Sequence, residues 1–413
     1  MRTALILVAA LAATVLALPA GADTIIVDPG GTYTTIQAGI DAAQEGDTVE
    51  VVAGTYTGDG NRDLSFGTKN ITLVSQSGAA STIIDNEADG GHRLFNFYGG
   101  GQDTTCLIDG FTIRGGRFVQ AGSPGGGIRI DGTGPGGYPN PKFANCTIHN
   151  NHSYGGNGGG VYINMYCDPV FDNCTFDGNT ALSSGGGVYV SMYSEPILRG
   201  CTFTNNQCST GFGGGIAFNY SDPAVVRHAT FAGNASGDQG GAIGCYRANP
   251  SIIYAAISYN LATTTGGACY AQDADPDFYG CTIVKNRALQ GGSVYHSTAN
   301  AYPTFSDCIM AYSQAAETRG STYLCDNGGD AIITYCCSYG NPDGDTMCGT
   351  VMLCLEEDPL FCHIWDDDIT LASNSPCLPS GNPWGRQMGL FAQGCVESPV
   401  EEASWGAIKA LYR

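Results

Sequence analysis

The stretch PVFDNCTFDGNTALSSGGGVYVSMYSE, residues 169–195, decides the fold because it is one of seven copies of the same pattern. Each copy begins at a proline, and successive prolines are 26 to 28 residues apart. The prolines are Pro141, Pro169, Pro196, Pro223, Pro250, Pro276 and Pro303. A fixed period of this length indicates a solenoid, in which each repeat buries its apolar face only against its neighbours.

The apolar residues within residues 169–195 follow a period of two, as in Cys174 and Phe176 or Val188 and Val190. This spacing is typical of strands and not of the 3.6-residue pattern of helices. Glycine or asparagine interrupts every run, so no run could hold an amphipathic helix. We therefore expect three short strands and three bends per repeat, stacked about 4.8 Å apart as a parallel β-helix.

Stacking in register places equivalent residues in columns. One predicted inward column contains Cys146, Cys174, Cys201, Cys281 and Cys308, interrupted by Ala229 and Ala255. Another contains Asn151, Asn179, Asn206, Asn234, Asn260 and Asn286. Amide side chains can bond one another and the backbone groups that a bend leaves unpaired, so we interpret the asparagine column as structural.

The repeats resemble those of right-handed parallel β-helix proteins of the pectin-lyase-like fold. The sequence GGAI at 240–243, preceded by FAGN at 231–234, also resembles the GGA(I/L/V) and FxxN repeats of chlamydial polymorphic membrane proteins. That resemblance covers the coil alone, and it implies an all-β, right-handed solenoid with an adhesin-like role.

The N-terminal residues predict export and a capped coil. Residues 1–22 contain Arg2, an apolar run and small residues before Asp23, which is the pattern of a secretory signal peptide. Residues 23–58 predict an N-terminal cap that resembles the cap of pectin-lyase-like β-helices, with Ile36 and Ile40 on the buried face of a short helix. The β-helix itself is expected over 59–312, and no segment of the mature chain is apolar enough to span a membrane.

Residues 313–395 are expected to hold the last turns and a cysteine-rich C-terminal cap. Eight of the 18 cysteines fall there: Cys325, Cys336, Cys337, Cys348, Cys354, Cys362, Cys377 and Cys395. In an exported protein this density predicts that most of them form disulfides, and the lack of a paired CxxC set disfavours zinc. Residues 396–413 differ in composition and predict either a sorting tag or a short terminal helix.

The composition limits the partners. The net charge is −21, and the 17 basic residues form no cluster. Nucleic acid and anionic membrane surfaces are therefore excluded as expected partners, and polyuronates are disfavoured. We expect a monomer, since the coil buries its own core.

The first candidate site is an outward row formed by Asp172, Arg199 and Arg227 on consecutive turns, with His228 beside it. Two arginines and a carboxylate about 4.8 Å apart could bind a sugar acid, or they could form a surface ion-pair row. If the protein is an enzyme, these four residues are its candidate catalytic residues.

The second candidate site is acidic and the third is aromatic. The residues before four repeat prolines are a candidate Ca²⁺ site, although Asp before Pro is also ordinary turn chemistry: Asp168, Glu195, Asp222 and Asp275. Five tyrosines after the glycine clusters or near the next bend are predicted to face outward and bind glycans: Tyr162, Tyr189, Tyr193, Tyr270 and Tyr295.

The pectin-lyase-like fold hosts both enzymes and proteins without catalysis, so the fold does not choose a function. The motif set of the family's hydrolases and the epimerase motif Asp-Pro-His-Asp are absent. We therefore predict an exported scaffold, secreted or on the cell surface, that binds a glycan or a surface without catalysis. The alternative is a polysaccharide lyase or glycoside hydrolase.

Overall fold

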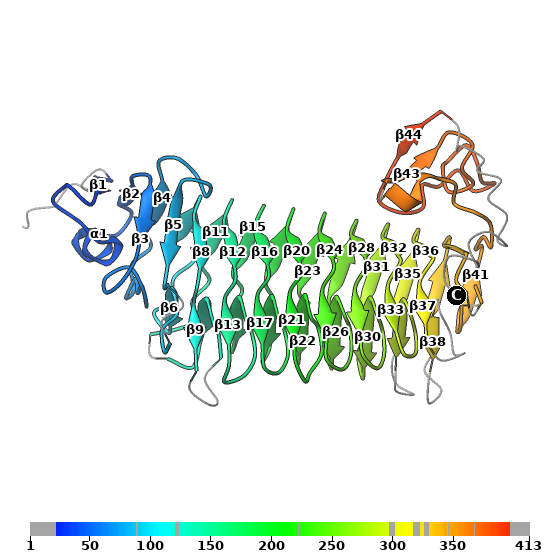
Figure 1. The fold of residues 1–413 in the computed structure, drawn as a ribbon, viewed down its shortest axis with the longest axis horizontal. Coiled ribbons are helices and arrows are strands. Elements are labelled where there is room, and N and C mark those ends of the chain that lie inside the picture. Colours follow the sequence, from blue (N-terminus) through cyan, green and yellow to red (C-terminus); the bar gives the residue numbers. More distant parts are fainter. Residues whose placement is uncertain are drawn as a thin grey trace, which may run out of the picture.

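The computed structural model describes residues 22–396 except 88–89, 120–123, 135, 222, 297–301, 317–322, 326–329, 343, 346 and 367. The chain forms a long coil of parallel strands with a small additional sheet near one end (Figure 1). Nearly all of the predicted signal peptide and C-terminal tail lie outside the described residues. The predicted parallel β-helix is confirmed.

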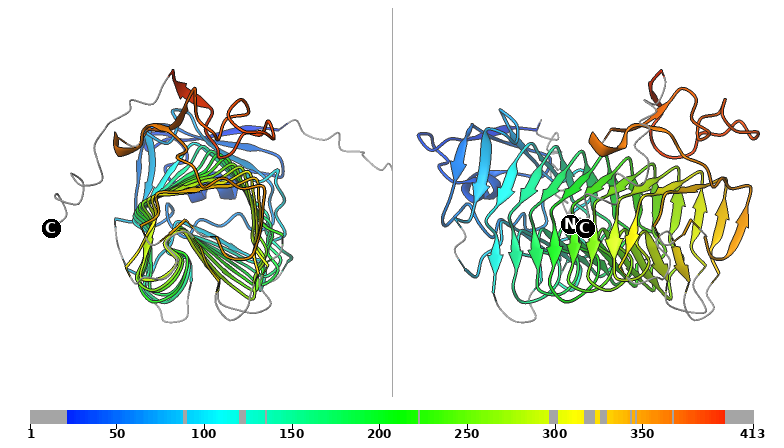
Figure 2. Two further views of the ribbon diagram at one scale, coloured as in Figure 1. Left: turned by 90° about the vertical axis from the view of Figure 1, so that its right-hand side faces the viewer. Right: turned by 45° about the vertical axis from the view of Figure 1, so that its right-hand side comes forward.

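Each central turn contributes four strands, not three. Residues 169–195 form β15 (Val170–Asp172), β16 (Thr175–Asp177), β17 (Thr180–Ala181) and β18 (Val188–Ser191). These strands belong to parallel sheets of 13, 11, 8 and 9 strands, which form the walls of the coil (Figure 2). The strand that the sequence did not predict is the third in each turn, for example β17. It has only two residues, which is too short to show a period of two in the sequence.

The predicted asparagine column is confirmed, and its six side chains are fully buried. Asn206 shows the pattern, because its Nδ2 donates to the carbonyl of Phe176 (2.8 Å) and to Oδ1 of Asn234 (3.0 Å). Its own Oδ1 accepts from the backbone N–H (3.1 Å) and from Nδ2 (3.0 Å) of Asn179. The column therefore joins successive turns through their interior and satisfies backbone groups at one bend.

The predicted cysteine column is also confirmed, since its five members are buried and unbridged. Cys336 and Cys354 extend the column. The backbone N–H of Cys308 donates to Sγ of Cys336 (3.4 Å), and the backbone N–H of Cys336 donates to Sγ of Cys354 (3.4 Å). Each thiol bonds backbone carbonyls: that of Cys201 donates to Phe171 (3.4 Å) and Arg199 (3.5 Å).

We expect the column cysteines to be unreactive in the folded protein. Burial raises the pKa of Cys201 to about 12, so at pH 8 its sulfur is a neutral thiol. Iodoacetamide at pH 8 should leave Cys174 and Cys201 unmodified until a denaturant is added. Mass mapping of a non-reduced digest checks the same column, and a Cys174–Cys201 disulfide would contradict it.

The N-terminal end of the coil is closed by α1 (Ile36–Ala42), which packs on β1 (Thr24–Val27) and β2 (Thr48–Val51). Ile36 and Ile40 are fully buried, and Oγ1 of Thr35 caps the helix by accepting from the N–H of Ala38 (3.3 Å). A side chain at Gly39 would overlap Val27 and Val49. Helix and strands can therefore approach closely only with glycine at this position.

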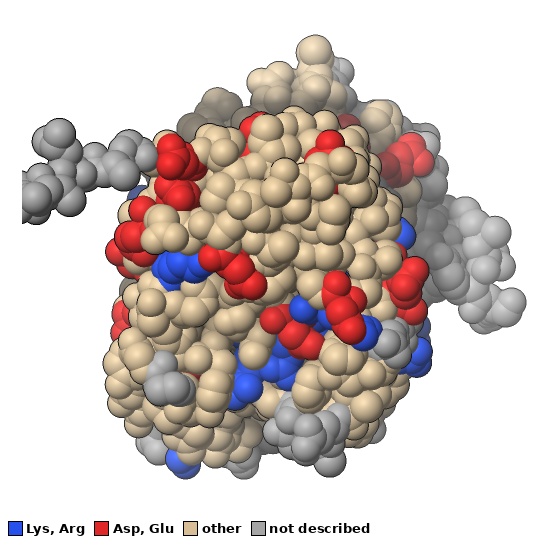
Figure 3. All heavy atoms as spheres, turned by 90° about the vertical axis from the view of Figure 1, so that its left-hand side faces the viewer, with Lys and Arg blue, Asp and Glu red and all other residues tan. Residues whose placement is uncertain are grey.

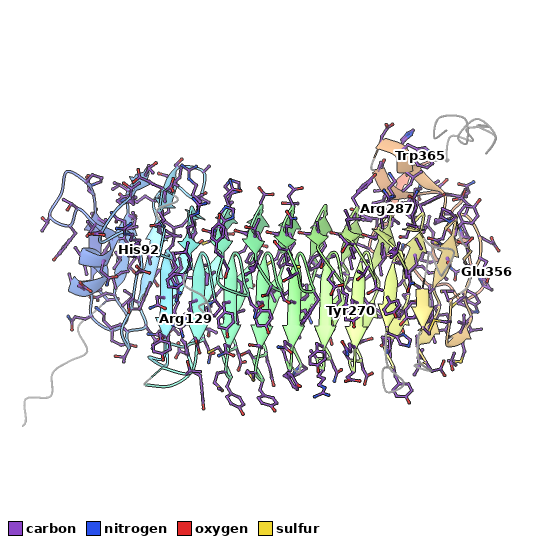
Figure 4. The ribbon with its side chains drawn as sticks, turned by 60° about the horizontal axis from the view of Figure 1, so that its bottom comes forward. His92, Arg129, Tyr270, Arg287, Glu356 and Trp365 are labelled. Carbon is purple, nitrogen blue, oxygen red and sulfur yellow. A yellow bond between two sulfur atoms is a disulfide. The ribbon has the colours of Figure 1, made fainter. Side chains whose placement is uncertain are left out.

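Residues 359–395, here called the C-terminal segment, lie on the flank of the coil (Figures 1 and 2). They include β42 (Phe361–His363), β43 (Asp368–Ala372) and β44 (Gln393–Cys395). The segment packs on the outward side of β32 (Thr282–Val284), β36 (Ile309–Ala311) and β40 (Cys337–Tyr339). Trp365 marks its position beside that flank in Figure 4.

The residues on the outer side of the last turns explain why the C-terminal segment packs on this flank. Four outward positions on these last turns are apolar, and they form one buried cluster with residues of the segment: Val284, Ile309, Ala311 and Cys337 with Phe361, Leu371, Cys377, Leu378 and Met388. Earlier turns carry polar residues at the equivalent positions, such as Asp177 and Thr204. The apolar flank therefore needs a cover, and the segment supplies it.

The structure contains two disulfides, Cys325–Cys348 and Cys362–Cys395. The structure bridges four of the eight C-terminal cysteines and not most of them as predicted, and it leaves Cys336, Cys337, Cys354 and Cys377 as thiols. The density of cysteines misled the prediction, since two of these four belong to the inward column that begins far upstream.

Candidate ligand-binding groove

A groove of about 600 Å³ lies along the first turns of the coil. Its lining is almost entirely polar: Asp85, Glu87, Arg114, Gly115, Arg117, His149, Asn150, His152 and Tyr154. Figure 3 views the molecule from the N-terminal end, where basic and acidic side chains gather around a hollow. Polar lining of mixed charge is what a ligand with many hydroxyl groups requires.

Strand register builds the first side of the groove. Asp85, Arg114 and His149 end β5 (Thr82–Asp85), β8 (Thr112–Arg114) and β12 (Thr147–His149), and Asp177 ends β16. These four residues pair directly from one strand to the next, and we call them the polar row. Neighbouring members are therefore one turn, about 4.8 Å, apart along the axis of the coil.

A second, shorter line of residues forms the other side. Arg117 of β9 (Arg117–Phe118) is in register with His152 of β13 (His152–Ser153), and His152 is in register with Thr180. Between the two sides the chain turns through Asn150, whose φ of 51° is left-handed. Asparagine adopts this left-handed conformation more readily than most residues, so Asn150 is well suited to the bend between the two sides of the groove.

Members of the polar row are paired with one another. Nε of Arg114 donates to Oδ2 of Asp85 (2.7 Å), and Nδ1 of His149 lies 3.1 Å from Oδ2 of Asp177. Nδ2 of Asn150 donates to Nε2 of His149 (2.9 Å), so Nε2 acts as the acceptor and the tautomer that fits carries its hydrogen on Nδ1, facing the carboxylate.

Asp177 is held ionised by its neighbours. Burial would raise the pKa of Asp177, but hydrogen bonds from Thr204 Oγ1 (2.7 Å) and Asn205 Nδ2 (3.1 Å) and the contact with His149 outweigh it. The pKa is therefore lowered, and the carboxylate is charged at neutral pH. It acts as a fixed acceptor that orients the imidazole.

The second side combines a cation with an aromatic ring. Nη2 of Arg117 donates to the hydroxyl of Tyr154 (2.7 Å), and its guanidinium lies 5.1 Å from the ring centroid. The His152 ring stacks on Tyr154 at 5.8 Å. Burial, followed by repulsion from Arg117, lowers the pKa of His152, so this ring is neutral at pH 7. Tyr154 remains 45% exposed and available to a ligand.

The spacing of the carboxylates limits the chemistry of the polar row. Asp85 and Asp177 are three turns apart, which is about 14 Å. Retaining and inverting glycosidases need two carboxyl groups about 5 to 9.5 Å apart. The row therefore provides donors and acceptors at regular intervals, but its two carboxylates cannot act as a glycosidase pair.

The predicted row exists, and it lies at the end of β15 and its neighbours, outside the lining of the groove. Asp172, Arg199 and Arg227 are in register, and Asp172 pairs with Nζ of Lys142 (2.7 Å) and Nε of Arg199 (3.1 Å). The neighbouring His228 stacks on the ring of Tyr254. These contacts form a surface ion-pair row, and its role in ligand binding or catalysis stays a prediction.

The acidic column uses its carboxylates to join turns. Oδ1 of Asp168 accepts from the N–H of Glu195 (2.7 Å), and Oδ1 of Asp275 accepts from the N–H of Tyr302 (2.5 Å). Burial raises the pKa of Asp168, and Asp222 lies outside the described residues. Among the described residues no group of three His, Cys, Asp or Glu side chains is arranged to hold a metal ion. Calcium binding stays a prediction.

Most of the predicted tyrosine site is buried. Tyr189, Tyr270 and Tyr295 are only 4–7% exposed, and burial raises the pKa of Tyr162 to about 12. The exposure predicted for Tyr189, Tyr270 and Tyr295 is therefore wrong, whereas Tyr162 is half-buried. Of the five predicted tyrosines, Tyr193 is the one that is well exposed (55%).

The glycine clusters explain this burial, because their turns fold back over the tyrosine-bearing strands. Gly185 approaches Cβ of Tyr189 so closely that a side chain there would clash. In the middle of the same column Gly244 stands where other turns have a tyrosine. The ring of Phe212 lies against this glycine and fills the place of the missing tyrosine ring. The rings thus form a cover on this flank of the coil.

Comparison with known proteins supports the fold. Residues 71–254 match the family model described as a right handed beta helix region, which includes every member of the polar row. A search of curated proteins found no significant match, and a search of solved structures found none. The matched region and the stacked parallel sheets together identify the coil as a right-handed parallel β-helix.

Proposed function

We propose that this protein binds a glycan chain in the groove without cleaving the backbone of that chain. The observation that carries the proposal is the polar row, which presents Asp85, Arg114, His149 and Asp177 in register along the axis of the coil. A linear polymer lying parallel to the axis would meet a new donor or acceptor at every turn. A globular ligand would use only part of such a row.

The chemistry of the groove fits sugar hydroxyls. A hydroxyl both donates and accepts, and the groove offers carboxylates, guanidinium groups, imidazoles and an amide within one cavity. The half-exposed ring of Tyr154 adds an apolar surface for the C–H face of a sugar ring. Asp85 neutralises the positive charge of its partner Arg114, which favours neutral glycans over polyanions.

Export is part of the proposal. Disulfides persist in oxidising compartments, and the two bridges agree with the predicted signal peptide. Within the part of the chain that the structure describes, no helix is long and apolar enough to cross a membrane. The protein would then meet its glycan outside the cytosol.

A binding assay tests the proposal. The mature protein is titrated with neutral plant glycans, pectate, alginate and glycosaminoglycans, with and without Ca²⁺. We expect the double variant Arg114→Ala/His149→Ala to bind at least about tenfold more weakly, since two lost hydrogen bonds at about 1 kcal/mol each exceed the 1.4 kcal/mol that makes a factor of ten.

The matched control is Arg199→Ala/Arg227→Ala in the row that contains Asp172, outside the groove, which should bind as the parent does. Loss of binding in that control alone would move the site to the row formed by Asp172, Arg199 and Arg227. New reducing ends would reveal a hydrolase, and ultraviolet-absorbing unsaturated products would reveal a lyase. Either product would contradict binding without cleavage, and absence of binding to every glycan would contradict the proposal as a whole.

A further inference from the structure

Two adjacent cysteines at the start of β40 face opposite sides of the coil wall. Cys336 belongs to the inward column, and its thiol donates to the carbonyls of Phe305 (3.6 Å) and Thr334 (3.4 Å). Side chains alternate between the two faces of a strand, so the next residue, Cys337, points outward. The outward side of this strand is the one that the C-terminal segment covers.

Cys377 meets Cys337 from the C-terminal segment. Both residues are fully buried, and they belong to the same apolar cluster between β40 and the C-terminal segment. The backbone around Cys377 is fixed, because its N–H donates to Oγ of Ser375 (3.1 Å) and its carbonyl accepts from the N–H of Met388 (2.9 Å). The thiol of Cys337 is fixed in turn by donating to the carbonyl of Glu357 (3.1 Å).

We propose that Cys337 and Cys377 form a third disulfide, which ties the C-terminal segment covalently to the coil. The two bridges already present cannot do this. Cys325–Cys348 closes a loop within the last turns, and Cys362–Cys395 closes a loop within the segment. Between coil and segment the polar ties include the ion pair of Arg386 with Asp307 and the bond from Lys285 to the carbonyl of Ile364.

The bridge forms by thiol–disulfide exchange with a protein disulfide oxidant. One cysteine thiolate attacks a sulfur of the oxidant's disulfide and forms a mixed disulfide, releasing one oxidant thiolate. The second cysteine thiolate then attacks the protein sulfur of the mixed disulfide, which forms the Cys337–Cys377 bond and releases the other oxidant thiolate. Two thiols lose two protons and two electrons, and the oxidant becomes a dithiol.

This step must precede packing of the segment. Once the segment covers β40, neither sulfur is accessible to an oxidant, and contact with Cys337 together with burial raises the pKa of Cys377 well above its usual range. Exchange needs a thiolate, so the packed thiols react slowly. Protein folded under reducing conditions should therefore keep both thiols, whereas protein folded in the presence of the oxidant should not.

The test counts thiols and maps the bridge. The full chain is folded with a disulfide oxidant, denatured without reduction and alkylated. We expect two fewer modified cysteines than the 14 that are free in the structure. Trypsin cannot separate the cysteines concerned, because no Lys or Arg lies between Arg319 and Arg386. Pepsin should release a linked pair of peptides, one containing Cys337 and one containing Cys377.

Cys336 and Cys337 are adjacent and stay on the same peptide after digestion. Matched variants are therefore needed to show which of the two is bridged to Cys377. The linked pair should persist in Cys336→Ser and disappear in Cys337→Ser and Cys377→Ser. Fourteen modified cysteines in the oxidised parent would overturn the proposal, as would a linked pair that is lost in Cys336→Ser. Neither result depends on glycan binding, so this proposal and the proposed function can fail separately.

Discussion

Asn206→Ala should destabilise the protein by about 3–6 kcal/mol, which is among the largest effects expected of any single substitution. The amide is fully buried and makes four hydrogen bonds to other turns. Its removal takes a partner from the carbonyl of Phe176 and from both the backbone N–H and the amide of Asn179. Each buried group left without a partner costs about 1–3 kcal/mol.

Chemical denaturation measures the effect, and the adjacent residue supplies the control. Gln207 follows Asn206 but points into solvent, so Gln207→Ala should change the free energy of unfolding by less than about 0.5 kcal/mol. Equal transition midpoints for the two variants would show that the asparagine column contributes little to stability.

Phe171→Ala should cost about 3–5 kcal/mol, as large-to-small substitutions in a packed core do. The ring is fully buried between neighbours, with its centroid 5.3 Å from that of Phe143 and 5.5 Å from that of Phe176. The cavity cannot be filled by a shift of one turn alone, because each turn is hydrogen-bonded to the turns on both sides.

The next residue in the chain is the matched control, because it faces outward from the same strand. Asp172→Ala removes ion pairs with Lys142 and Arg199, both of which are partly exposed to solvent. Exposed ion pairs contribute under about 1 kcal/mol, so the variant should stay close to the parent. Similar losses for Phe171→Ala and Asp172→Ala in urea would contradict the inward and outward assignments.

The fold was predictable because the same sequence pattern occurs seven times along the chain. Seven prolines at nearly constant spacing align the copies, and a column such as Asn179, Asn206 and Asn234 becomes visible without any structure. Features that occur once were not predictable. The C-terminal segment turns back onto Val284 and Ile309, and the period of the coil contains no information about a segment outside it.

The site was predictable only in part, because exposure depends on loops that lie outside the strand pattern. Period two correctly placed Tyr189 on the outer side of its strand, but the glycine turn that covers it has no apolar signature. The groove was missed for a different reason. Its signal was the residue after each Thr-apolar pair, namely Arg114, His149 and Asp177, and it lies partly in turns less regular than the seven copies.

The asparagine column gives the coil a further property, which is that its length is adjustable in whole steps. From Asn179 to Asn260, each turn of the column presents an amide oxygen to the turn before it and a backbone N–H to the turn after it. Excision of residues 223–249 would place Asp222 before Pro250, where an aspartate–proline junction already recurs in the pattern. Removal or insertion of one repeat should therefore change the distance between the groove and the C-terminal segment by one turn, about 4.8 Å.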